Sequence, residues 1–154
     1  MERSGRKQHI VLWAAFGLYA AALVWLVLLS RESRFVGGDY WQQVVESIHL
    51  EPLATIRRYT SLPFDPASKF WWIHAGVNLL GNVIVFVPLG WFLPALWRKQ
   101  RNFFRFTLTA SGLIILIELA QLLTFRGICD VDDFLLNLPG AILGFLLWYL
   151  FRKP

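Results

Sequence analysis

The residues best suited to chemistry open the stretch DVDDFLLNLPGAILG, which covers residues 130–144. Three carboxylates, Asp130, Asp132 and Asp133, precede a run that is otherwise almost wholly apolar, and Asn137 follows Asp133 by four residues. Residues four apart share one face of a helix. Carboxylates at a helix start can cap the backbone and favour the positive end of its dipole, but three of them exceed what capping needs.

Other polar residues interrupt two apolar runs further upstream. Glu118 and Gln121 are three residues apart, and Asn78 and Asn82 are four apart, so each pair shares a helix face. An ionisable group inside a membrane costs a few kcal/mol unless it is paired, protonated or hydrated, which favours a functional role for Glu118. Arg126, about two turns further along, is a basic partner for it. For the amides, a role as glue between membrane helices is an equal alternative.

The composition is that of a membrane protein. Hydrophobic residues make up 56% of the 154 residues and charged residues only 16%, against about 25% charged in soluble domains. The net charge of +5 comes from basic residues at the ends of apolar runs and not from a helical stripe, so nucleic-acid binding is not expected. Cys129 is the only cysteine, which excludes an intrachain disulfide.

Four apolar segments are long enough to cross a bilayer, which takes about 20 residues. They cover about 10–29, 72–97, 104–125 and 133–151, within a single domain of residues 1–154. The sequence therefore predicts an all-α polytopic protein with four transmembrane helices. We read the first as an uncleaved span, because its apolar run is longer than the core of a signal peptide.

The basic residues predict the orientation, because short cytoplasmic connections are rich in lysine and arginine. The third connection has only Arg126, among three aspartates. Both termini and the second connection are therefore expected in the cytoplasm, on the basis of Arg3, Arg6, Lys7, Arg98, Lys99, Arg101, Arg105, Arg152 and Lys153.

The first connection contains a predicted amphipathic helix. Trp41, Val44, Val45 and Ile48 recur with helical spacing between polar residues, and Pro52 marks the expected end of the helix. In this orientation the helix is extracytoplasmic, where it lies on the outer membrane surface or caps the bundle.

The same orientation places the polar residues of three helices in the outer half of the membrane, to a depth of about 12 Å. Gly81, Gly140 and Gly144 are expected to let neighbouring helices approach one another. We predict a shared polar layer that forms a ligand-binding site, made of Asn78, Asn82, Glu118, Gln121, Arg126, Asp130, Asp132, Asp133 and Asn137.

Several of these residues stand in motifs that resemble those of the VanZ-like family. NLLGNVIVFVPLG (78–90) is similar to its N-x-x-G-N-x-x-x-F-x-P-x-G signature, and IELAQLL (117–123) resembles its E-x-x-Q motif. RGICDVDDFLLNLPGAILG (126–144) resembles its R…D-x-D-D-x-x-x-N-x-x-G-x-x-x-G element, and HLEPLATI (49–56) is a weaker counterpart of its N-x-x-P-F-x-T-I stretch. Motif order and spacing agree over nearly the whole chain.

The resemblance implies a multi-pass protein of the bacterial cytoplasmic membrane. The family's namesake is associated with low-level resistance to teicoplanin, a lipidated glycopeptide antibiotic, and no reaction is established for the family generally. Our leading hypothesis is therefore an outer-leaflet site that binds an envelope lipid or precursor, or a lipoglycopeptide, and that contributes to teicoplanin tolerance. Membrane lipids are then the expected partners.

Two alternatives stay open at this point. The first is a membrane-embedded enzyme that acts on a lipid headgroup, using the carboxylates for acid–base work or, with His74, to hold a divalent metal. No nucleophile–base pair and no metal-ligand spacing stands out, so we expect no metal or cofactor and favour binding over catalysis. The second is a structural subunit of a membrane complex, whose polar layer only ties helices together.

Overall fold

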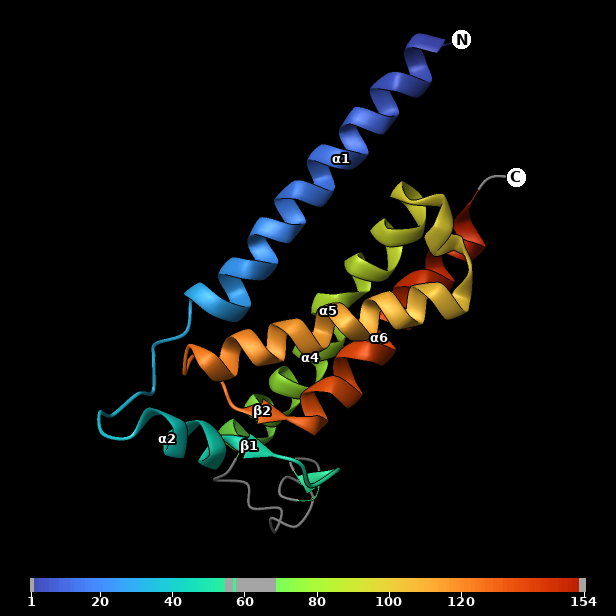
Figure 1. The fold of residues 1–154 in the computed structure, drawn as a ribbon. Coiled ribbons are helices and arrows are strands. Elements are labelled where there is room, and N and C mark those ends of the chain that lie inside the picture. The colour runs from blue at the N-terminus through green and yellow to red at the C-terminus, as the bar shows by residue number, and fades with distance from the viewer. Residues whose placement is uncertain (1, 55–56, 58–68, 153–154) are drawn as a thin grey trace.

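The computed structural model describes residues 2–54, 57 and 69–152, without the side chains of residues 2–5, 69–72, 74, 75 and 78. Its main elements are four long helices (Figure 1). They are α1 (Glu2–Val24) continued by the π-helix η1 (Trp25–Leu29), α4 (Lys69–Leu96), α5 (Phe103–Leu123) and α6 (Val131–Phe151).

These helices confirm the predicted fold class. By length and composition, four helical segments can cross a membrane: Arg6–Leu29, Leu79–Leu96, Phe103–Leu123 and Val131–Phe151. Many of their large apolar side chains are exposed, as on a surface that faces lipid. The chain is therefore a multi-pass membrane protein.

The closest helix contact is between α4 and α6, and glycines make it possible. A Cβ atom added at Gly140 would lie 2.1 Å from the carbonyl oxygen of Val83, and one at Gly144 would lie 1.9 Å from that of Val87. On α4, Gly90 makes the reciprocal close approach to the α6 backbone. The two backbones thus touch at a distance that no other residue type allows.

Gly81 does not take part in this contact, although the sequence suggested a packing role for it. A Cβ atom there would meet nothing within 4 Å. Val83 and Val87 are four residues apart and share the face of α4 that meets α6, whereas Gly81 precedes Val83 by two residues, about 200° away around the helix. It faces the cavity described below.

Apolar side chains fill the bundle on the side of the termini. Phe106 and Ile114 of α5 and Ala141 of α6 are completely buried, and the rings of Phe106 and Phe145 are 4.6 Å apart. Phe86 of α4, which is 2% exposed, belongs to the same cluster. The opposite end of the bundle, which carries α2, β1 and β2 (Figure 1), is called the loop end here.

The loop end contains the predicted amphipathic helix in a shorter form. Helix α2 covers Tyr40–Glu46, and Ile48–His49 form strand β1, parallel to β2 at Cys129–Asp130. The helix therefore ends well before Pro52, the end predicted from the sequence, because the residues after it pair with another strand. Of the predicted apolar face, Val44 is buried, while Trp41 is 67% exposed.

The structure predicts that Gly144→Ala loosens the α4–α6 contact, because the new methyl group overlaps the α4 backbone. The expected loss of stability is about 1–3 kcal/mol, measured by thermal unfolding of the detergent-purified protein. The matched control is Gly112→Ala in α5, where the added Cβ meets nothing within 4 Å. If the two variants are equally stable, the close α4–α6 contact does not require glycine at position 144.

Candidate functional site

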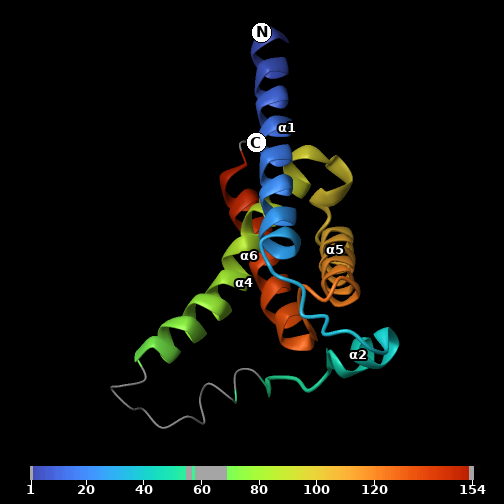
Figure 2. The same cartoon turned by 90° about the vertical axis from the view of Figure 1, so that its left-hand side faces the viewer.

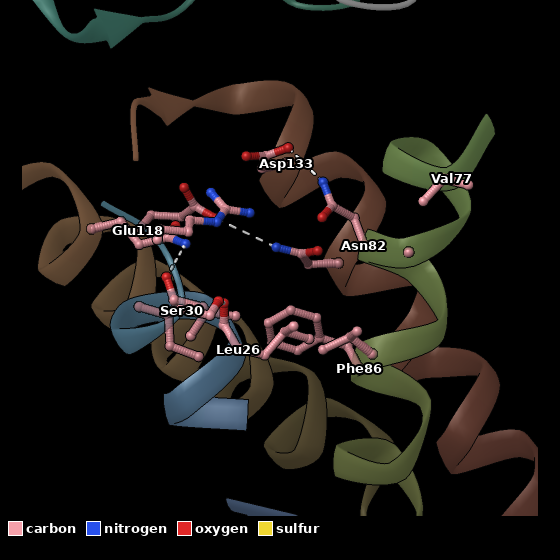
Figure 3. A pocket seen from close by; sticks show the side chains of 14 residues that line it. Leu26, Ser30, Val77, Asn82, Phe86, Glu118 and Asp133 are labelled. Carbon is pink, nitrogen blue, oxygen red and sulfur yellow. Dashed lines mark hydrogen bonds between the residues drawn. The ribbon is translucent and has the colours of Figure 1, made fainter. Parts of the chain in front are cut away.

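A cavity of about 510 Å³ lies near the loop end, between η1 and helices α4, α5 and α6 (Figure 3). Its apolar lining comes from Leu26 and Val27 of η1, Val77, Val85 and Phe86 of α4, and Ile117 of α5. Its polar lining is Ser30, Arg31, Asn82, Glu118, Gln121, Asp133 and Asn137. Five of the nine residues predicted for the polar layer therefore line one cavity.

Two polar residues of this lining, Glu118 and Asn137, are buried, with only 5% and 4% of their surface exposed. The side-chain amide of Asn137 donates to Glu118 Oε1 at 3.4 Å. Glu118 Oε2 and Asn137 Oδ1 are buried and have no hydrogen-bond partner in the part of the chain that the structure describes. Leaving buried acceptors unsatisfied costs about 1–3 kcal/mol each, so a hydrogen-bond donor at this place would be stabilised.

A second carboxylate is held at the edge of the cavity by an amide. Asn82 Nδ2 donates to Asp133 Oδ1 at 2.6 Å, and Figure 3 shows the two side chains directed toward one another from α4 and α6. The amide of Gln121 has a different role, because it donates to the Val27 carbonyl oxygen at 2.9 Å and joins α5 to η1. One amide thus positions a carboxylate, and the other ties helices together.

Arg31 is a cavity residue that sequence reasoning missed. It directly follows the first span, at the start of a loop with mixed charges, where it reads as an ordinary flanking residue. The structure brings it to the same cavity as Glu118 and Asp133. The only signal for it in the sequence was its position at the predicted outer end of the first span. The acidic start of the fourth span is predicted to lie at the same outer surface.

Arg126 does not line the cavity. Its guanidinium donates to the carbonyl oxygens of Leu28, Leu29 and Arg31, at 3.0, 3.1 and 2.8 Å. The last carbonyls of a helix have no partner within the helix, and a cation at that end is also favoured by the helix dipole. Arg126 therefore caps η1 and fixes the backbone that carries Arg31.

Asp130 and Asp132 also lie outside the cavity lining. Asp130 is the N-cap of α6 and accepts a hydrogen bond from the Asp132 N–H at 2.9 Å. Asp132 is 1% exposed and accepts from the backbone N–H of Leu53, which has a positive φ of 63°. These two carboxylates organise the start of α6 and its contact with the first connection, and the third, Asp133, reaches the cavity.

The metal alternative involved His74 together with the three aspartates. The side chains of His74 and Asn78 lie outside the described residues. Within the described part, no group of three or more His, Cys, Asp or Glu side chains could hold a metal ion. Burial, together with the nearby carboxylates of Glu118, Asp130 and Asp133, raises the pKa of the Cys129 thiol, so the reactive thiolate is disfavoured near neutral pH.

Comparison with protein families identifies the chain. The VanZ/LLP1 family model matches residues 16–152, nearly the whole length, so the chain belongs to this family. Comparisons with curated proteins and with solved structures gave no match.

The hydrogen bonds of Arg126 predict a structural effect. Arg126→Gln should lower stability by about 2 kcal/mol, measured as thermal unfolding in detergent, because three carbonyl oxygens lose a charged donor. Arg34→Gln is the matched control, since Arg34 is exposed and lies at the same end of the bundle. If both variants unfold at the wild-type temperature, Arg126 does not cap η1.

Proposed function

We propose that this member of the VanZ/LLP1 family binds the headgroup of an amphiphile in its cavity. The ligand would be an envelope lipid, a lipid-linked envelope precursor or a lipoglycopeptide. The observation that carries the proposal is the pair of buried acceptors, Glu118 Oε2 and Asn137 Oδ1, which lack donors among the described residues of a cavity. An apolar bundle could close without them, so their burial calls for a compensating partner.

The shape of the lining supports an amphiphile over a fully polar solute. Polar groups from three helices gather around Glu118, while the remaining wall consists of aliphatic and aromatic side chains. On that wall, Val77 is 66% exposed and Leu26 is 44% exposed. In a membrane, such exposed apolar residues face lipid chains. A headgroup inside the cavity would therefore have its chains beside an apolar surface.

We place the cavity in the outer leaflet. Within the proposed orientation, the basic termini and the basic connection Arg98–Arg101 (η3) lie in the cytoplasm. The cavity lies at the opposite, loop end of the bundle. A ligand that arrives from outside the cell, or a lipid of the outer leaflet, would then reach it without crossing the membrane.

Binding at this position would support a contribution to teicoplanin tolerance. Teicoplanin is a glycopeptide with a fatty-acyl chain, so it combines a polar body with a membrane anchor. A protein that binds such a molecule, or that binds an envelope precursor lipid, would change which molecules the outer surface exposes.

The proposal predicts that Glu118→Gln and Asp133→Asn abolish teicoplanin tolerance conferred by the chain in a susceptible bacterial host, because each variant removes a carboxylate that lines the cavity. The measurement is growth inhibition at matched protein abundance in the membrane. Glu32→Gln, at an exposed carboxylate that does not line the cavity, serves as the control.

Unchanged tolerance in both cavity variants would overturn the proposed function. If the two cavity variants lose abundance in the membrane but keep tolerance per amount of protein, the polar residues have a structural role. They would then serve only to hold the helices together.

A further inference from the structure

We infer that the cavity selects a headgroup that carries a primary ammonium next to an anionic group, as in an aminophospholipid with ethanolamine phosphate. This inference rests on the proposed function, since it names the chemistry of the amphiphile bound there. It stands on three features of the cavity: its unfilled acceptors, its one guanidinium among the described residues, and its size.

The unfilled acceptors call for more than one N–H. Glu118 Oε2 comes from α5 and Asn137 Oδ1 from α6, and the hydrogen bond between Asn137 Nδ2 and Glu118 Oε1 keeps the two side chains together. A hydroxyl donates one hydrogen bond, whereas a primary ammonium donates three. An ammonium can thus satisfy both acceptors, and its charge is favoured beside the carboxylates of Glu118 and Asp133, both of which line the cavity.

The anionic group has a counterpart in Arg31. This is the one arginine or lysine in the described cavity lining, since Arg126 directs its guanidinium to backbone carbonyls. A guanidinium pairs well with phosphate oxygens. A headgroup with only negative charge would meet two carboxylates, and one with only positive charge would leave Arg31 without a partner from the ligand. A zwitterion matches both.

The volume also fits a headgroup. About 510 Å³ falls within the range of small-molecule sites, about 300–1,000 Å³, but two full acyl chains would not fit beside a headgroup. The chains would therefore leave the cavity along its apolar wall, past the exposed side chains of Val77 and Leu26.

The test compares three lipids with identical acyl chains. The full-length protein in detergent is titrated with phosphatidylethanolamine, phosphatidylcholine and phosphatidylglycerol, and the bound lipid is quantified by native mass spectrometry. Phosphatidylcholine keeps the phosphate and the positive charge but has no N–H, so it isolates the donor. We expect phosphatidylethanolamine to bind at least about tenfold more tightly than the other two, because hydrogen bonds between charged groups are the strong ones.

Variants of single residues test the acceptors, the guanidinium and the space of the cavity one at a time. Glu118→Gln should abolish the preference for phosphatidylethanolamine over phosphatidylcholine, while Arg31→Gln should weaken the binding of both by a similar factor. Glu32→Gln and Arg34→Gln are the matched controls and should behave as the wild type. Gly81→Leu should block all three lipids, because the position lines the cavity and a Cβ there meets nothing within 4 Å.

The possible results separate a failure of this inference from a failure of the proposed function. Equal affinity for the three lipids, with all binding lost in Gly81→Leu, would overturn the ammonium inference and leave the amphiphile site intact. Lipid binding that Gly81→Leu does not change would mean that the cavity holds none of these phospholipids. This result overturns the inference, while the tolerance test with Glu118→Gln and Asp133→Asn still decides the proposed function. If Glu118→Gln does not fold, the wild-type ranking and Gly81→Leu still decide.

Discussion

The structure depends on one constraint, the burial of a carboxylate and an amide inside an apolar bundle without enough donors for their oxygens. Glu118 and Asn137 satisfy each other through one contact only, and two acceptors stay unfilled among the described residues. In a membrane such groups have little access to water, so their cost persists unless a ligand, a proton or water enters. Other polar residues of the cavity lining, such as Asn82, Asp133 and Arg31, surround this pair.

Helix packing explains why there is room at this place. The glycines of α6 bring its backbone against α4 near Val83 and Val87, and toward the loop end α4 diverges from α6 (Figure 2). Gln121 and Arg126 hold η1 across the other side through its carbonyl oxygens. The cavity thus lies between the close α4–α6 contact and the η1 backbone that Gln121 and Arg126 hold, and side chains do not fill it.

The sequence was sufficient for the four long apolar helices and for five of the polar residues that line the cavity, because both follow from rules of length and helical period. Asn82, Glu118 and Asn137 line one cavity, because they stand at matching heights on neighbouring helices. What could not be predicted depends on tertiary contacts. The role of Arg126 needs the position of η1, the early end of α2 needs the partner strand β2, and Arg31 follows a span at a place where most arginines are solvated.

The most direct measurement is an experimental structure of the full chain in lipid nanodiscs that contain phosphatidylethanolamine. We expect density for a headgroup in the cavity, with its amine within hydrogen-bond distance of Glu118 and Asn137 and its phosphate beside Arg31. A closed cavity in which Glu118 Oε2 and Asn137 Oδ1 are satisfied by protein groups alone would contradict it.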